Sequence, residues 1–197
     1  MRQADLTRQR LVRAALELFT TRGYHDTTTP LLAKKAGVAE GTIYRHFDSK
    51  EHLLNELYRG AARWATKLVQ DAAQAPGAPR ERLHAAARAL VDGAARDPGV
   101  ARMLFLGDHG ALLDERSKDA ARDLARALES LVAQGKAQSA VRTGSVELWA
   151  GVWLAVVRHV LEKICAGEWK ADQPQVEVAL DAAWGAIGQA GGRADGQ

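Results

Sequence analysis

The chain has 197 residues, enough for one or two hydrophobic cores, and its 47% hydrophobic and 26% charged residues are typical of a globular protein. This composition excludes disorder over most of the chain. Residues 1–50 hold nine Lys and Arg against five Asp and Glu, a net charge of +4, whereas the rest hold 18 against 19. Positive charge at the N-terminus suits a surface that faces phosphates.

Three absences narrow the class of protein further. A single cysteine, Cys165, excludes an intrachain disulfide. The polar start of the chain lacks the hydrophobic segment of a secretory signal. The longest apolar run, 148–157, is about half of the roughly 20 residues that cross a bilayer, and Arg158 ends it. We therefore expect a soluble cytoplasmic protein without a membrane span.

Apolar residues recur at helical spacing throughout, and no stretch alternates as a strand does, which predicts an all-α fold. The first helix is expected over 6–22. Thr28 is a suitable N-cap for a short second helix that ends at Gly37, and a third follows over 39–47. Asp48 and Glu51 have the spacing of a capping box for a long fourth helix that ends near 74. The remaining helices are expected over 80–96, 98–106, 110–135, 145–167 and 174–188.

Two short helices around a glycine, as predicted for 27–47, form the pattern of a helix-turn-helix. Ala33 is small where the two helices must approach each other, and Gly37 can adopt the positive φ of a tight turn. Ile43 and Phe47, at positions i and i+4, are expected to pack inward. The N-terminal end of the third helix would then enter the major groove of DNA. The alternative is an ordinary helical hairpin.

The outward side chains of this motif suggest distinct DNA contacts. Arg45 suits a guanine edge, and Thr42 suits a phosphate or a thymine methyl. Hydrogen-bond donors that can reach the DNA backbone are present in Tyr44, His46 and Lys50. Thr28 lies at a helix N-terminus, where a phosphate can bind. Glu40 either accepts from a cytosine amine or is solvated. The predicted DNA-binding residues are Thr28, Glu40, Gly41, Thr42, Tyr44, Arg45, His46 and Lys50.

Several short segments within about residues 6–55 follow a recognisable pattern. They are Gly23-Tyr24, Thr27-Thr28, Leu32-Ala33, Ala36-Gly37-Val38, Gly41-Thr42-Ile43-Tyr44, His46-Phe47 and Lys50-Glu51. Together they resemble the N-terminal pattern of the tetracycline-repressor (TetR) family of bacterial transcription regulators, which favours the helix-turn-helix over the hairpin. Two positions depart from the family's usual chemistry. Ala39 stands where a polar cap is common, and Glu40 where relatives are commonly basic or neutral.

The resemblance implies a three-helix DNA-binding head and a helical body that dimerises and holds an effector, about nine helices in total. The expected parts are a DNA-binding domain over 1–50, an effector-binding and dimerisation domain over 51–188 and a disordered tail over 189–197. It further implies a repressor, active as a homodimer on a palindromic double-stranded operator and released by a small molecule. The motif does not distinguish a repressor from the rarer activator.

The body carries no motif of comparable specificity, so its sites follow from the implied architecture. Apolar and aromatic walls suit a hydrophobic or aromatic effector, although the same side chains could simply fill the core. The expected pocket residues are Trp64, Met103, Phe105, Leu106, His109, Trp149 and Trp153. Apolar stripes near the C-terminus suggest a dimer interface formed by Val152, Val156, Val160, Val176, Leu180 and Trp184.

Other classes of function are less consistent with this sequence. A helical enzyme or small-molecule carrier with a vestigial head is the main alternative, but no nucleophile at motif spacing supports catalysis. A nonspecific architectural DNA binder usually has a larger excess of Lys and Arg than +3. The histidines show no paired Cys/His spacing. We expect no enzyme activity, no metal and no cofactor.

Overall fold

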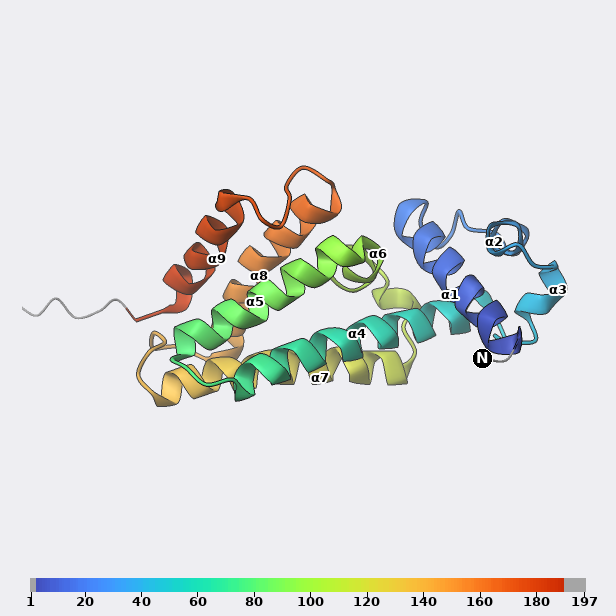
Figure 1. Cartoon of the computed structure of the whole chain (residues 1–197). Coiled ribbons are helices and arrows are strands. Elements are labelled where there is room, and N and C mark those ends of the chain that lie inside the picture. Colours follow the sequence, from blue (N-terminus) through green and yellow to red (C-terminus); the bar gives the residue numbers. More distant parts are fainter. Residues whose placement is uncertain (1–2, 190–197) are drawn as a thin grey trace, which may run out of the picture. The chain divides into compact units, whose positions relative to one another are not determined.

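A computed structural model describes residues 3–189, which contain nine α-helices, and the expected all-α class is confirmed (Figure 1). In the described part of the chain, the only extended pairing is an isolated bridge between Val141 and Gly188. None of the described helices is both long and apolar enough to cross a bilayer. The helices are α1 (Gln3–Thr21), α2 (Thr29–Ala36), α3 (Glu40–Ile43), α4 (Lys50–Gln74), α5 (Pro79–Arg96), α6 (Pro98–Ala101), α7 (Glu115–Ala137), α8 (Val146–Cys165) and α9 (Pro174–Ile187).

The chain forms two compact units. Of the described residues, the first unit comprises 3–63 together with Asp97–Ala121, and the second comprises Trp64–Arg96 together with 122–189. The expected boundary between the DNA-binding domain and the effector-binding domain, at residue 50, falls at the first residue of α4, within the first unit. Apart from Gln189, the expected disordered tail lies outside the described residues.

The first unit is built on the buried face of α1. Leu11, Ala15 and Phe19 are spaced four residues apart and are nearly inaccessible to solvent, as the helical period requires. They pack in one hydrophobic cluster with Leu32 of α2 and with residues from the start of α4. Burying one such Leu or Phe side chain contributes about 1.5–3 kcal/mol. The cluster therefore fixes α2 and the turn after it against α1.

One predicted helix end and one predicted cap near the helix-turn-helix differ from the structure. Helix α3 ends at Ile43 because the amides of Arg45 and His46 bond to carbonyls three residues back, at 3.3 and 2.9 Å, which tightens the chain into a turn. The predicted Asp48–Glu51 capping box does not form. Ser49 caps α4 instead, and its Oγ accepts from the amide of His52 at 2.9 Å.

The predicted helix over 98–106 is only partly α-helical. Helix α6 has four residues and is followed by a π-helical turn, Arg102–Leu106, in which the amide of Gly107 donates to the Arg102 carbonyl at 2.9 Å. A 3-10 turn, Gly110–Leu112, separates this segment from α7. The predicted start of α7 at 110 is therefore early by five residues. Apolar spacing over a single turn does not separate these helix types.

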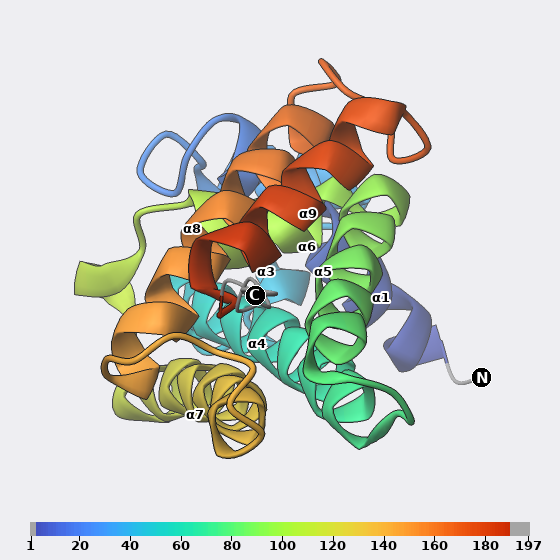
Figure 2. The same ribbon diagram turned by 90° about the vertical axis from the view of Figure 1, so that its left-hand side faces the viewer.

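In the second unit, α5, α8 and α9 pack against one another (Figure 2). Trp153 and Val157 of α8 and Val176 of α9 are fully buried among them. A polar seam joins α5 to α9: His84 Nε2 lies 2.8 Å from Glu177, and Arg80 lies 2.9 Å from Asp181. Exposed ion pairs of this kind contribute little to stability, so the apolar contacts hold the three helices together.

Candidate nucleic-acid interface

Helix α2 begins and ends as the sequence predicts. Thr28 has an extended backbone, and its Oγ1 accepts from the amide of Leu31 at 3.4 Å, which caps the helix. Gly37 ends α2 in the left-handed region, with φ 64° and ψ 44°. The amide of Val38 then donates to the Ala33 carbonyl at 3.0 Å, a Schellman closure. This closure turns the chain sharply from α2 into α3.

The turn is braced from α1. Arg10 Nη2 donates to the Gly37 carbonyl at 2.7 Å, and Lys35 Nζ pairs with Glu17 at 2.6 Å. Both contacts join α2 or its C-terminal turn to the solvent side of α1. Helix α1 thus orients α2 through a buried face and through polar contacts at its rim.

The short α3 and the turn after it are amphipathic. Ile43 and Phe47 point into the core, with 2% and 1% of their surface exposed, as predicted. Tyr44 is 56% exposed, and Arg45, Glu40 and Gly41 are exposed with it. Thr42 and His46 are half-buried. The Arg8 guanidinium lies 5.2 Å from the centre of the Phe47 ring. The predicted contact residues between Glu40 and His46 are therefore exposed or half-buried.

Ala39 precedes α3 without a side-chain hydrogen bond to the helix. The expectation that this residue leaves α3 uncapped is confirmed. An uncapped four-residue helix has few internal hydrogen bonds, so its stability comes from Ile43 and from the residues it packs against.

Lys50 is bound to the loop that precedes Thr28. Its Nζ donates to the carbonyls of Tyr24 and Thr27 at 2.8 and 2.9 Å, and it lies 4.1 Å from the centre of the Tyr24 ring. Burial lowers the pKa of Lys50, and nearby Asp26 opposes that shift. The sequence-based prediction of a direct phosphate contact from Lys50 stays a prediction.

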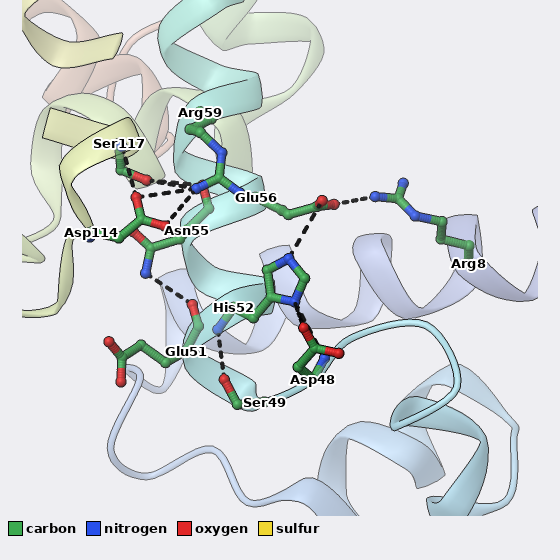
Figure 3. A network of polar contacts seen from close by, with 10 residues as sticks. All are labelled: Arg8, Asp48, Ser49, Glu51, His52, Asn55, Glu56, Arg59, Asp114 and Ser117. Atoms are coloured by element: carbon green, nitrogen blue, oxygen red, sulfur yellow. Dashed lines mark hydrogen bonds and ion pairs between the residues drawn. The ribbon is translucent and has the colours of Figure 1, made fainter. Parts of the chain in front are cut away.

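Behind the motif, the first turns of α4 carry a polar network (Figure 3). Asn55 is 2% exposed and uses both ends of its amide: Nδ2 donates to the Leu112 carbonyl at 2.9 Å, and Oδ1 accepts from the amide of Asp114 at 2.8 Å. Arg59 Nη1 pairs with Asp114 at 2.9 Å. These contacts fix the start of α7 on the start of α4.

Asp114 also caps α7, because its Oδ1 accepts from the amide of Ser117 at 2.7 Å. Burial alone would raise the pKa of this carboxyl, but the hydrogen bonds from Ser117 and the pairing with Arg59 hold it below its ordinary value. The charged form of Asp114 is therefore favoured in the folded chain.

On the other side of α4, a second chain of contacts runs back to α1 (Figure 3). His52 lies between Asp48 and Glu56, with its ring nitrogens 3.4 and 3.7 Å from their carboxylate oxygens. Glu56 pairs in turn with Arg8. Sequence reasoning missed this network. The asparagine among the apolar residues of α4 and the i,i+4 spacing of His52 with Asp48 and Glu56 were usable signals. The pairs Arg8–Glu56 and Arg59–Asp114 join residues 48 and 55 positions apart, which sequence spacing does not pair.

The residues predicted to line an effector pocket are divided between the two units. Met103 lies in the hydrophobic cluster of the first unit, where Phe105 is also buried and Leu106 half-buried. His109 is 8% exposed, its Nε2 has no hydrogen-bond partner, and burial lowers its pKa. In the second unit, Trp153 is buried, and Trp64 and Trp149 are half-buried. An effector pocket formed by these residues stays a prediction.

The six predicted dimer residues differ in exposure. Val160, Val176 and Leu180 are at most 2% exposed within the chain itself, so core packing already accounts for them. Val152, Val156 and Trp184 are half-buried. Two exposed apolar side chains were not anticipated: Leu148 on α8, 52% exposed, and Val178 on α9, 69% exposed. These are positions where a partner could cover apolar surface.

Residues 11–57, which include all of α2 and α3, match the family model of bacterial regulatory proteins of the tetR family. Over this N-terminal segment, the chain is similar to the regulators of that family. Over 81 residues it is 36% identical to the HTH-type transcriptional repressor KstR2 of Mycobacterium tuberculosis, covering 41% of this chain and 40% of that protein. Over 59 residues it is 39% identical to the fatty acid metabolism regulator protein of Bacillus subtilis, covering 30% of each. The chain thus matches these curated relatives over about two fifths of their length or less.

Solved structures of tetR family members share the fold over nearly the whole chain. A regulator from Marinobacter aquaeolei has a TM-score of 0.80 at 21% identity, covering 96% of this chain and all of that one. KstR2 of Mycobacterium tuberculosis has a TM-score of 0.73 at 22% identity, covering 93% and 95%. The tetR likeness therefore extends in sequence over the helix-turn-helix and in fold over the helices that follow.

Proposed function

We propose that this chain is a sequence-specific DNA-binding transcriptional regulator of the tetR family. The observation that carries the proposal is the exposure of Tyr44 and Arg45, with half-buried Thr42 close to them in sequence, on a helix-turn-helix fixed by the Gly37 turn and by α1. Arg45 would read a guanine edge, and Tyr44, His46 and Thr28 would hold phosphates. Glu40 and Gly41 are also exposed and would limit which bases can approach.

The regulator would act as a homodimer on a palindromic operator. Two half-sites one helical turn apart lie about 34–36 Å from each other, and a two-fold dimer presents two recognition helices with matching symmetry. The half-buried Val152, Val156 and Trp184, together with exposed Leu148 and Val178, supply candidate apolar surface for the interface. DNA binding would belong to residues 1–50, and dimerisation and effector binding to residues 51–188. The regulator would act in the cytoplasm, where the chromosome lies.

A small hydrophobic molecule would relieve repression. One relative is a ketosteroid transcriptional regulator and another is a fatty acid metabolism regulator protein, which favours an apolar effector over a charged one. Trp64, Trp149 and Trp153 of the second unit are aromatic side chains suited to such a ligand. The effector would have to bind the DNA-free state more tightly than the DNA-bound state.

The test is a fluorescence anisotropy titration of the full chain at moderate salt. One duplex carries the DNA that flanks the chain's own gene, and the other is a random sequence of equal length. We expect tighter binding to the first by a factor of at least about 10³, the lower end for specific sites. Equal affinities for the two duplexes would contradict the proposal.

Two variants separate the recognition surface from general charge. Arg45→Ala removes a proposed base contact, whereas Lys170→Ala removes one exposed positive charge from the second unit. Only the first should reduce the preference for the specific duplex. A non-enzymatic regulator should also leave candidate small molecules chemically unchanged, so turnover without DNA binding would favour the alternative of a helical enzyme.

A further inference from the structure

The last turn of α9 is capped by one residue from the loop between α7 and α8. Arg142 Nε donates to the Gly188 carbonyl at 2.9 Å, and its Nη2 donates to the Gly185 carbonyl at 3.0 Å. The backbone amide of Arg142 donates to a third carbonyl, that of Ile187, at 2.9 Å. The last carbonyls of a helix have no intrahelical partner. A residue 43 to 46 positions earlier in the sequence thus supplies the C-terminal cap of α9.

The backbone around this cap is paired as well. Figure 1 shows the end of α9 beside the loop that follows α7. Val141 and Gly188 form an isolated antiparallel bridge, and the amide of Gln189 donates to the Ala140 carbonyl at 2.8 Å. Val141 is buried against Gly135 of α7, where an added Cβ would lie 2.9 Å from Val141 Cγ2. This loop therefore holds the end of α9 through backbone and side-chain bonds, and it is itself anchored on α7.

The capped turn carries Trp184, one of the half-buried residues proposed for the dimer interface. Its ring lies against Gly188, because a Cβ added to that glycine would be 2.7 Å from Trp184 Cε2. The amide of Gly188 also donates to the Trp184 carbonyl at 2.7 Å. The backbone of Gly188 is thus in contact with Trp184 and bonded to Arg142, so a displacement of this turn would move the indole ring.

We propose that Arg142 is a positioning residue for homodimerisation, which holds the last turn of α9 so that Trp184 packs against the partner subunit. The inference rests on the proposed homodimer, because it concerns how this chain forms the interface. In this role Arg142 does not itself contact the partner. Two nitrogens of its guanidinium are bonded within the chain, and its positive charge is favoured at the C-terminal end of a helix by the helix dipole.

The shape of an arginine side chain suits this position. Two carbonyls are reached by two different nitrogens of one planar guanidinium, whereas a lysine ammonium is a single point charge on a flexible stem. Arg142 is exposed, so its hydrogen bonds compete with water and contribute modestly to the stability of the chain. Removing the guanidinium should leave the second unit folded while the turn that carries Trp184 becomes mobile. A change in dimerisation can therefore be separated from unfolding.

The test measures the dissociation constant of the dimer by sedimentation velocity over a range of chain concentrations. Arg142→Met removes the two guanidinium bonds and keeps the backbone pairing. The matched control, Arg126→Met, removes another exposed arginine of the same unit, which pairs with Asp123 on its own helix. We expect the dissociation constant to rise by about tenfold for Arg142→Met, the effect of losing one hydrogen bond from a charged group, and to stay unchanged for Arg126→Met. An unchanged dissociation constant for Arg142→Met, or an equal rise in both variants, would overturn the inference.

Two further readouts separate a positioning role from a direct contact with the partner. Hydrogen–deuterium exchange, at a concentration where every variant is dimeric, should be faster over residues 184–189 in Arg142→Met and unchanged in Arg126→Met. Trp184→Ala combined with Arg142→Met should raise the dissociation constant by less than the product of the two single effects, because both weaken the same contact. Unchanged exchange, or fully multiplicative effects, would show that Arg142 does not act through this turn and would overturn the inference.

Arg142→Lys tests geometry against charge, and it replaces Arg142→Met if that variant does not fold. Lysine keeps the positive charge but lacks the fork that reaches two carbonyls. We expect this variant to dimerise more weakly than the wild type, with faster exchange at the end of α9, and wild-type values of both would overturn the inference. A wild-type chain that stays monomeric would overturn the proposed homodimer together with the role of Arg142 in it. A wild-type dimer beside an equally stable Arg142→Met dimer would overturn the inference alone.

Discussion

Replacing Gly37 by alanine should destabilise the helix-turn-helix without touching its apolar core. Gly37 has φ 64°, and a left-handed conformation costs a residue with a Cβ roughly 1–2 kcal/mol. A Cβ built at this position lies 2.4 Å from Arg10 Nη2, so the guanidinium must move. Its bond to the Gly37 carbonyl is exposed, and its loss adds about 0.5–1 kcal/mol, the lower part of the range for such bonds.

We therefore expect Gly37→Ala to lower the free energy of unfolding of the first unit by about 1.5–3 kcal/mol. Urea denaturation followed by circular dichroism measures this change. All five tryptophans lie in the second unit, so their fluorescence follows that unit separately. In an Arg10→Ala background, Gly37→Ala should lower the free energy of unfolding by less, because the Arg10–Gly37 hydrogen bond is already absent. A double-mutant cycle measures this difference.

The matched control is Gly41→Ala. Gly41 is helical, and a Cβ there meets nothing within 4 Å, so alanine should be neutral or should stabilise α3 by up to about 1 kcal/mol. The reasoning is refuted if Gly37→Ala unfolds at the wild-type urea concentration, or if Gly41→Ala is equally destabilising. Gly41→Ala nevertheless adds a methyl group to the proposed DNA-facing surface, so its DNA affinity is informative separately.

Three further predictions concern other parts of the chain. Arg45→Ala should cost about 1–3 kcal/mol of DNA binding and relax the preference at one base pair, which titration of single-base operator variants measures; uniform weakening would contradict it. Asp114→Asn keeps a helix cap but removes a carboxylate whose pKa is lowered by folding. In the wild type this carboxylate stabilises the fold above about pH 4, and that stabilisation is lost as the pH falls further. The variant should therefore be less stable above about pH 4 and should lose less stability on acidification, as measured by denaturation at a series of pH values. A loss of stability on acidification equal to that of the wild type would show that this charge does not matter. Gly93→Ala places a Cβ 2.1 Å from Trp64 Cζ2 and should cost about 1–3 kcal/mol by tryptophan-detected urea unfolding, and a wild-type midpoint would show that the ring moves freely.

Local chemistry made the helix-turn-helix predictable from sequence. Thr28 as a cap, Gly37 as a left-handed turn and Ile43 with Phe47 as an inward pair each follow from the conformational preference of one residue or from the helical period. Amphipathic spacing over long segments placed α1, α4 and α5 to within a few residues for the same reason.

Boundaries failed where competing local options have similar free energies. Asp48 and Ser49 both suit a cap, and the backbone at the start of α4 uses Ser49. The segment after Ala101 has helical spacing in sequence yet forms a π-helical turn, because apolar periodicity over five residues does not fix the hydrogen-bond step. Such choices depend on the packing of neighbouring elements.

The sequence by itself determined the helical class, the turn at Gly37 and the exposed face around Tyr44 and Arg45, because each depends on residues close together in the chain. Only the tertiary structure decided which polar groups bond to one another. Lys50 reads as an exposed cation in sequence, but folding brings it to the carbonyls of residues more than twenty positions earlier. Hydrogen bonds between distant segments have no local signature, so the partners of Lys50 and Asn55 emerge only from the folded chain.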